Sequence, residues 1–324
     1  MLPSGSDSRL MAGRNFTRFM NNVLSGLIAA PFTPFQTDGS LALPVISQLA
    51  ALLQRNGVNG AFVCGTTGEG SSLTLPERFQ VAEEWRRAAP RGALKLVVHV
   101  GHLSLPDACA LSRHAQDISA DAIAAIAPSF FKPSRVEDLV DWCVPVAAAA
   151  PKLPFYYYHM PAMTGVAVTA TEFLRHADGR IPSLAGIKFT HEDLVDYRAA
   201  RAFGNGKYSI LFGRDEILLS GLQLGAPGAV GSTYNYATPV YHRIINAYAA
   251  NNLTAATAEQ VKACAFIDVM SAAGGLPAGK AIMGLIGIDC GPVRLPLRQL
   301  TSDEIAALRN GLADVGFFDL ASRL

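Results

Sequence analysis

Eight short apolar runs, separated by segments with helical periodicity, constrain the fold of this chain more than any other feature of its sequence. Each run is nearly all apolar, as strands buried on both faces are, which favours a parallel sheet covered by helices. The runs begin at Gly26, Gly60, Lys95, Ala122, Phe155, Leu184, Ser209 and Gly228. Eight strand–helix units within about 225 residues are what a (β/α)8 TIM barrel requires. A doubly wound open sheet is the weaker alternative, because no GxGxxG follows the first run.

The strand signal stops near Ala249, and helical segments with glycine and proline breaks follow. They cover about residues 253–273, 279–286 and 302–315, the last beginning at Thr301 or Ser302 with Glu304. We therefore predict an N-terminal extension over residues 1–24, a barrel over 25–248 and a helical C-terminal region over 249–324. The extension has no continuous apolar stretch, so it predicts a disordered segment rather than a secretory signal. An organelle transit peptide is the alternative.

The composition predicts a soluble protein that binds neither nucleic acid nor membranes. Half of the 324 residues are apolar and 16% are charged, which suits a large buried core. The formal net charge is +1, and the basic residues form no run that would attract nucleic acid or anionic lipid. No uninterrupted apolar run reaches the roughly 18 residues that a spanning helix needs. The five cysteines are odd in number and show no CxxC spacing, so we expect reduced thiols and a cytoplasmic location.

A lysine lies near the end of the sixth run, Leu184-Ala185-Gly186-Ile187-Lys188-Phe189-Thr190. On a strand, residues two apart share a face, so Lys188 lies opposite Ile187 and Phe189. If those two pack under helices, Lys188 points into the barrel. Desolvation favours a neutral lysine amine, which attacks ketones to form a Schiff base. The alternative is a lysine that reaches water at the strand end, and this run alone favours that alternative.

Other polar residues follow the strands at the carboxyl end of the predicted barrel, where active sites of such barrels form. They are Thr66, Thr67, Glu69, His99, His102, Tyr158, His159, Thr190, Arg214, Asp215, Glu216, Ser232, Thr233, Tyr234 and Asn235. The set is rich in hydroxyls and poor in metal ligands, so we predict no metal site.

Several of these positions also have a purely structural interpretation. The Thr66–Glu69 loop can hold a carboxylate through hydroxyls and backbone amides, but an ordinary strand–helix turn fits equally well. Tyr158 can pass protons or can be a core aromatic. His99 and His102 lack a third ligand, which favours a structural role over a metal site. The pair Asp215-Glu216 can bind a cation or sugar hydroxyls, or can be an exposed helix cap.

Four motifs in this order resemble one enzyme family. They are Gly65-Thr66-Thr67-Gly68-Glu69, Tyr158-His159-Met160-Pro161, Gly186-Ile187-Lys188-Phe189-Thr190 and Gly228-Ala229-Val230-Gly231-Ser232-Thr233-Tyr234-Asn235. Together they resemble the dihydrodipicolinate synthase/N-acetylneuraminate lyase family of pyruvate-dependent Schiff-base aldolases, from about Gly26 to the end of the chain. Residues 126–128, 155–166 and 212–216 are similar to the lyase branch of that family.

The resemblance implies a (β/α)8 barrel with a helical C-terminal region, a small 2-keto acid substrate, no metal or organic cofactor, and a homotetramer. It implies that Lys188 forms the Schiff base, that Tyr158 is the general acid/base with Thr66 beside it, and that Thr66 and Thr67 bind the pyruvate carboxylate. The residues implied to hold a sugar chain are Thr190, Gly213, Asp215, Glu216 and Ser232. The implied reaction is retro-aldol cleavage of N-acetylneuraminate to pyruvate and N-acetylmannosamine.

Two positions depart from the relatives that this pattern resembles. The synthase branch carries an arginine for a second substrate carboxylate where this chain has Met163, which argues against dihydrodipicolinate synthesis. Many relatives place a tyrosine from a neighbouring subunit in the proton relay where Phe130 stands. Phe130 cannot pass a proton, so either Tyr158, Thr66 and water suffice or the loop 129–132 is shifted. The alternatives to the lyase are another 2-keto acid aldolase or dehydratase of the family, and an inactive barrel that only binds a keto acid.

Overall fold

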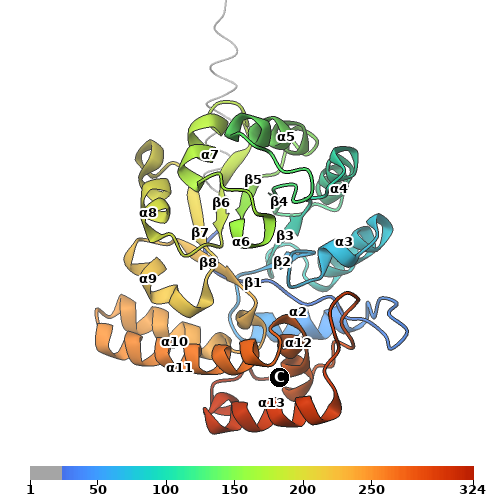
Figure 1. Ribbon diagram of the computed structural model, residues 1–324, viewed down its shortest axis with the longest axis vertical. Coiled ribbons are helices and arrows are strands. Elements are labelled where there is room, and N and C mark those ends of the chain that lie inside the picture. Colours follow the sequence, from blue (N-terminus) through green and yellow to red (C-terminus); the bar gives the residue numbers. More distant parts are fainter. Residues whose placement is uncertain (1–23) are drawn as a thin grey trace, which may run out of the picture. The chain divides into compact units, whose positions relative to one another are not determined.

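The computed structural model describes residues 24–324, and in this range eight parallel strands form a closed barrel with helices around it (Figure 1). The strands pair in chain order, and β8 returns to pair with β1. They are β1 (Gly26–Ala29), β2 (Gly60–Val63), β3 (Lys95–His99), β4 (Ala122–Ile126), β5 (Phe155–His159), β6 (Leu184–Phe189), β7 (Ser209–Phe212) and β8 (Gly228–Gly231). The predicted (β/α)8 TIM barrel with a C-terminal helical extension is confirmed.

Helices follow the strands along the chain. Those of the barrel are α2 (Val45–Arg55), α3 (Leu75–Ala88), α4 (Leu105–Asp117), α5 (Val136–Ala148), α6 (Pro161–Thr164), α7 (Ala170–Ala177), α8 (Leu194–Ala202), α9 (Leu218–Gln223) and α10 (Thr238–Ala249). The C-terminal ones are α11 (Leu253–Ala272), α12 (Leu276–Leu285) and α13 (Ser302–Asp314). Short 3₁₀ helices are η1 (Gly70–Ser72), η2 (Phe203–Gly206), η3 (Asp215–Ile217), η4 (Thr233–Asn235) and η5 (Phe317–Asp319).

Two compact units divide the described residues, and each is treated by itself below. The central unit is Val100–Leu211 together with Leu24, and the terminal unit is Ser25–His99 together with Phe212–Leu324.

The core of the central unit forms around β4, β5 and β6. All five residues of β5 are buried, and Tyr157 stacks on Phe173 of α7 with ring centroids 4.2 Å apart. Local signals start the helices that cover this sheet. Thr169 and Glu172 form a capping box at the start of α7, and the Asp193 carboxylate accepts hydrogen bonds from the first amides of α8.

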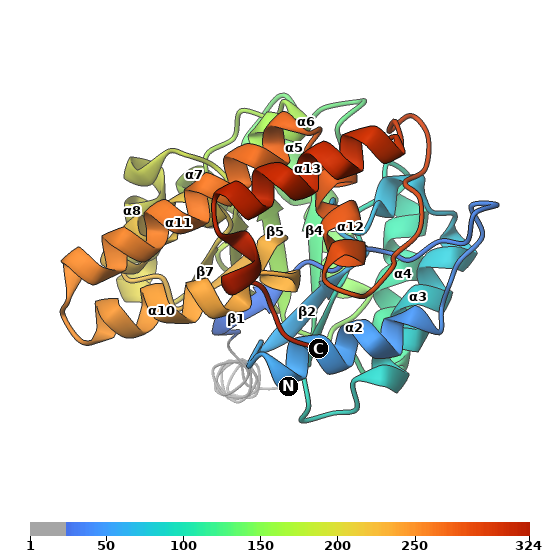
Figure 2. The same cartoon turned by 90° about the horizontal axis from the view of Figure 1, so that it is seen from below.

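In the terminal unit, capping boxes begin two helices, and one of them is the helix expected to begin at Thr301 or Ser302 with Glu304. Thr74 with Glu77 begins α3, and Thr301 with Glu304 begins α13. Helix α12 begins at Leu276, three residues before the predicted start at 279. The prediction took the preceding glycine and proline as a break, but Pro277 fits the first turn of a helix, where a backbone N–H is not needed. Helices α10 and α11 lie side by side as a hairpin (Figure 2).

The predicted boundaries of the N-terminal extension, the barrel and the C-terminal region stay predictions. The expected N-terminal extension over residues 1–24 lies, apart from Leu24, outside the described residues. Helix α10 ends at Ala249, close to the expected end of the barrel at 248. Within residues 24–324 no single helix is long and apolar enough to cross a membrane. Helices α11 and α12 reach that length and apolarity only together, and the pair is bent by 113°.

Candidate active site

Lys188 lies on β6, and its side chain is buried, with 4% of the residue exposed. The register between β5 and β6 places it opposite Tyr158, and Lys188 Nζ lies 4.0 Å from the centroid of the Tyr158 ring. On the other face of the strand, Phe189 packs edge to face on Tyr197 of α8, with centroids 5.3 Å apart. The predicted alternation along this strand is therefore confirmed. Because the Lys188 side chain is buried, the alternative in which it reaches bulk water is excluded.

The Tyr158 side chain offers its ring to Lys188 and its hydroxyl to a sulfur atom. The hydroxyl donates a hydrogen bond to Met160 Sδ at 3.0 Å. A thioether is a weak acceptor, so this hydrogen bond exchanges readily for one to a substrate oxygen. The π face of the ring attracts a cationic nitrogen at this distance. The pair therefore combines a potential nucleophile with a proton-carrying group.

His159, the next residue on β5, has a structural role. Its ring lies 5.0 Å from that of Phe189, and its Nε2–H donates to the Val168 carbonyl at 3.2 Å. Burial lowers the pKa of His159 to about 4, so the ring is neutral at pH 7.

Thr190 directly follows β6 and contacts β5 through its backbone. Its backbone N–H donates to the His159 carbonyl at 2.8 Å. Its Oγ1 is buried and has no hydrogen-bond partner. A buried polar atom left without a partner costs about 1–3 kcal/mol, so a bound ligand that pairs with this hydroxyl would recover stability.

In the terminal unit, Thr66 and Thr67 lie in the loop between β2 and η1. The loop closes on itself, because the Glu69 amide donates to the Thr66 carbonyl and the Gly70 amide donates to the Gly65 carbonyl, each at 3.0 Å. A Cβ atom on Gly70 would lie 2.0 Å from the Cys64 carbonyl oxygen, so this closure requires glycine. Both threonines are partly exposed, which leaves them accessible to a ligand.

Asp215 of η3 is also in the terminal unit, and its side chain is buried, with 6% of the residue exposed. Its Oδ2 accepts hydrogen bonds from the Thr233 amide at 3.1 Å and the Thr233 hydroxyl at 2.6 Å. Thr233 gives its one hydroxyl hydrogen to the carboxylate, so the Tyr241 hydroxyl, 2.6 Å away, donates to Thr233. Burial raises the pKa of Asp215, and the hydrogen bonds from Thr233 oppose that rise.

This arrangement corrects one interpretation of the sequence. The pair Asp215-Glu216 is not an exposed helix cap, because only Glu216 is partly exposed and it pairs with Arg214 Nη2 at 2.9 Å. The Asp215 carboxylate fits in this buried position because the residue beside it, Gly231, has no side chain. A Cβ atom on Gly231 would lie 1.8 Å from Asp215 Oδ1. Gly213 and Ser232, which flank this group in the chain, are partly exposed.

The described residues thus form two polar groups. Lys188, Tyr158 and Thr190 lie together on the paired strands β5 and β6 of the central unit. Asp215, Gly231 and Thr233 lie together at the ends of β7 and β8 of the terminal unit, next in the chain to Gly213, Glu216 and Ser232.

Comparison with known proteins identifies the family of this chain. The sequence model of the dihydrodipicolinate synthetase family matches residues 23–314. The chain belongs to this family. It is 43% identical to the N-acetylneuraminate lyase of Rattus norvegicus over 303 residues, which cover 92% of this chain and 95% of that protein. The predicted membership of the dihydrodipicolinate synthase/N-acetylneuraminate lyase family is confirmed.

Solved structures of the same family superimpose on this chain. The N-acetylneuraminate lyase of Proteus mirabilis is 44% identical, with a TM-score of 0.88 over 91% of this chain and 99% of that one. A catalytic lysine mutant of the Ruminococcus gnavus sialic acid aldolase is 26% identical, with a TM-score of 0.85 over 92% of this chain and 98% of that one.

The two histidines considered as metal ligands lie in the terminal unit and the central unit respectively. His99 Nδ1 lies 3.1 Å from the Cys64 carbonyl oxygen, and the Arg78 guanidinium donates to the His99 carbonyl at 2.5 Å. His102 Nδ1 accepts from the Ser104 amide at 3.0 Å. Over residues 24–324, no group of three or more His, Cys, Asp and Glu side chains is placed to hold a metal ion.

We expect keto-acid cleavage by the full chain to survive dialysis against EDTA without loss. The physical reason is that the family resemblance implies an imine to a lysine, which would supply the electron sink that a metal would otherwise provide. The measurement is the initial rate before and after dialysis, with and without added zinc or manganese. Activity that disappears with the chelator and returns with either metal would contradict the expectation and revive His99 and His102 as ligands.

Several residues around these groups were not predicted. The Met160 contact to Tyr158, the support of Asp215 by Thr233 and Tyr241, and an ion pair between Glu69 and Lys280 emerge only in the folded chain. Thr233 had a sequence signal, since it lies in the Gly228–Asn235 motif. Tyr241 and Lys280 had none, because both lie in segments that read as ordinary helices.

Proposed function

We propose that this chain is an N-acetylneuraminate lyase, which cleaves N-acetylneuraminate to pyruvate and N-acetylmannosamine through a Schiff base on Lys188. The observation that carries the proposal is the buried Lys188 amine 4.0 Å from the Tyr158 ring. The relatives support it, since the rat and Proteus mirabilis proteins are N-acetylneuraminate lyases. The Ruminococcus gnavus sialic acid aldolase has a catalytic lysine, and Lys188 is the residue that we assign to that role here.

The first half of the reaction forms the imine. The neutral Lys188 amine attacks the keto carbon of the substrate, and the adduct loses water to give a protonated imine. The Tyr158 ring face stabilises this cation by its π electrons. Thr66 and Thr67 bind the adjacent carboxylate through their hydroxyls and the amides of their loop.

The second half breaks the carbon–carbon bond. Tyr158 takes the proton of the hydroxyl that lies two carbons from the imine. Thr66 and water complete the proton relay, because Phe130 has no hydroxyl. The electron pair of the breaking bond flows into the imine and gives an enamine and N-acetylmannosamine. Protonation of the enamine and hydrolysis of the imine release pyruvate and restore the amine. No metal or organic cofactor takes part.

Met163 supports the lyase over the synthase of the same family. A site for aspartate semialdehyde needs a cation for the aldehyde's own carboxylate, and Met163 of α6, which is 62% exposed, offers none. The test is a substrate panel of N-acetylneuraminate, 2-keto-3-deoxygluconate, 4-hydroxy-2-oxoglutarate and aspartate semialdehyde with pyruvate. N-acetylneuraminate should have the highest kcat/KM. Faster turnover of any other member would refute the substrate assignment and leave only the aldolase chemistry.

We expect Asp215→Asn and Glu216→Gln to lower kcat/KM for N-acetylneuraminate by about tenfold to a hundredfold, because hydrogen bonds from sugar hydroxyls to a carboxylate are strong. Trapping of pyruvate by borohydride should hardly change, because pyruvate has no hydroxyl chain. The measurement compares both quantities in each variant. If trapping and cleavage fall equally, the two carboxylates have a structural role only. If neither changes, they do not bind the sugar.

The proposal extends to location and assembly. The five cysteines are all free, which supports a reducing, cytoplasmic location. Phe130 and Phe131 are 76% and 87% exposed and pack edge to face with centroids 5.0 Å apart. Exposed aromatic pairs of this kind support self-association, and we propose the homotetramer that the family resemblance implies.

A further inference from the structure

Glu69 ends the Gly65-Thr66-Thr67-Gly68-Glu69 loop in a backbone conformation that few non-glycine residues adopt. Its φ is 51° and its ψ is 33°, the left-handed region. The residue is 4% exposed, so the turned backbone directs the carboxylate into the protein rather than to water. A buried carboxylate is stable only with partners, and Glu69 finds its partners in the C-terminal region of the chain.

The first partner is Lys280 of α12. Lys280 Nζ lies 3.0 Å from Glu69 Oε1, and the two side chains are 2% and 0% exposed. The same amine donates to the Pro292 carbonyl at 2.6 Å and lies 4.2 Å from the centroid of the Phe35 ring. The ammonium group therefore contacts two oxygen acceptors and one aromatic ring, and Glu69 compensates its charge.

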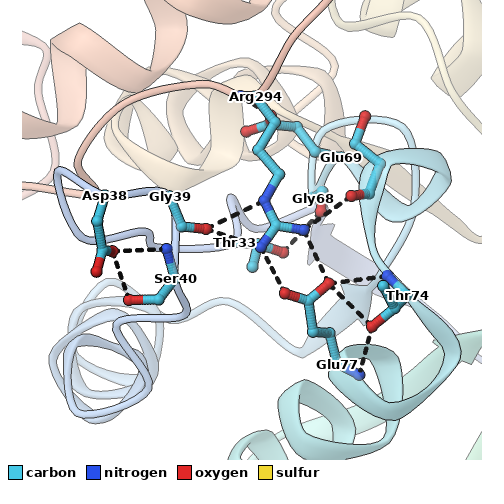
Figure 3. Close-up of polar contacts among 10 residues, drawn as sticks. Thr33, Asp38, Gly39, Ser40, Gly68, Glu69, Thr74, Glu77 and Arg294 are labelled. Atoms are coloured by element: carbon cyan, nitrogen blue, oxygen red, sulfur yellow. Dashed lines mark hydrogen bonds and ion pairs between the residues drawn. The ribbon is translucent and has the colours of Figure 1, made fainter.

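The second partner is Arg294, which follows α12 in the chain (Figure 3). Its backbone N–H donates to Glu69 Oε2 at 2.8 Å. Its guanidinium donates to the carbonyls of Ser72 and Gly39 and to the Glu77 carboxylate, each at 2.8 Å. Arg294 therefore connects the end of the loop, the first turn of α3 and the turn at Gly39.

These contacts bind one short segment from both sides. The Thr33 hydroxyl donates to the Gly68 carbonyl at 2.6 Å (Figure 3), and Lys280 and Arg294 hold the next residue, Glu69. Thr66 and Thr67 directly precede these two anchored positions. Movement of residues 68 and 69 would therefore shift the backbone of the two threonines.

We propose that Glu69, Lys280 and Arg294 are positioning residues for the substrate carboxylate, through which the C-terminal helical region shapes the Thr66–Thr67 loop. The inference rests on the proposed function, which assigns that loop to the carboxylate of a 2-keto acid. These residues do not touch the substrate. They affect the affinity for the substrate carboxylate and leave the maximal rate of imine formation at Lys188 unchanged.

The test is Lys280→Met in the full chain, which removes the charge and keeps most of the side-chain length. We expect the pyruvate concentration for half-maximal borohydride trapping to rise about tenfold to a hundredfold, since bonds to a charged group are lost along the loop. The maximal trapping rate should stay close to that of the wild type. Trapping of acetone, a ketone without a carboxylate, should not change, whereas general damage to the barrel would lower both.

The matched control is Lys262→Met on α11. Lys262 Nζ lies 2.6 Å from Glu259 Oε1, but the lysine side chain is 50% exposed, so its loss should change neither trapping reaction. Glu69→Gln keeps the acceptor oxygen and should shift the pyruvate dependence in the same direction. It carries the test if circular dichroism shows that Lys280→Met does not fold. The double variant should lose less than the sum of the single variants, because neither partner is then left as an unpaired buried charge.

The outcomes separate the inference from the function on which it rests. An unchanged pyruvate dependence in folded Lys280→Met and Glu69→Gln overturns the inference alone. Equal losses with pyruvate and acetone show a purely structural role and also overturn it. If the wild type traps no pyruvate, the proposed function fails, and the inference fails with it.

Discussion

Replacing Lys188 with alanine is expected to abolish the borohydride-stable adduct with pyruvate and to remove cleavage of N-acetylneuraminate. Every step of the proposed reaction passes through the bond between the Lys188 nitrogen and the keto carbon, so no partial route remains in the variant. The loss should be on the order of the whole enzymatic acceleration, about 10⁶-fold or more. Mass spectrometry of the reduced protein gives the adduct, and coupled detection of pyruvate gives the rate.

The fold should tolerate this change. Ile187 and Phe189, which pack on the outer face of β6, are untouched, and removing a buried amine also removes the cost of burying it. Lys152→Ala is the control, because Lys152 is an exposed lysine of the same unit and should trap pyruvate as the wild type does. An adduct on Lys188→Ala, or a wild-type adduct mapped by peptide analysis to another lysine, would contradict the mechanism.

The barrel could be predicted from the sequence because its strands are buried on both faces. Runs such as Ala122–Ile126 and Ile210–Phe212 contain only apolar residues, so the sequence of a few consecutive positions predicts their burial. Helix starts were predictable for a similar reason. The capping boxes at Thr74 and Thr301 involve residues three apart, so the sequence itself contains both partners.

The surroundings of the candidate site could not be predicted in the same way. Glu69 and Lys280 are 211 positions apart, and their ion pair depends on where α12 packs. The burial of Asp215 depends on Gly231 and Thr233 of another strand, whereas the local pattern Arg214-Asp215-Glu216 reads as an exposed helix start. Lys188 could be predicted in part. Strand alternation predicts which face of β6 its side chain lies on, but only the folded structure shows that the side chain is buried.

Tyr158→Phe is the second change with a large expected effect. Removing the hydroxyl takes away the group that accepts the substrate proton, and loss of a general base costs about 10²- to 10⁴-fold in kcat. Pyruvate should still form an adduct with Lys188, since phenylalanine offers the same ring face to the nitrogen. Stability should change by no more than about 1 kcal/mol, because the hydrogen bond from the hydroxyl to Met160 Sδ ends on a weak acceptor.

The control for this variant is Tyr157→Phe, one position away on the opposite face of β5. The Tyr157 ring stacks on Phe173 in the core, with centroids 4.2 Å apart, so loss of its hydroxyl should leave cleavage near the wild-type rate. The measurements are kcat for N-acetylneuraminate, its pH profile and the pyruvate trapping rate in both variants. Wild-type cleavage by Tyr158→Phe would remove this residue from the proton relay and assign the base to Thr66 or water. A fall in trapping as large as the fall in cleavage would instead place Tyr158 in imine formation rather than in bond cleavage.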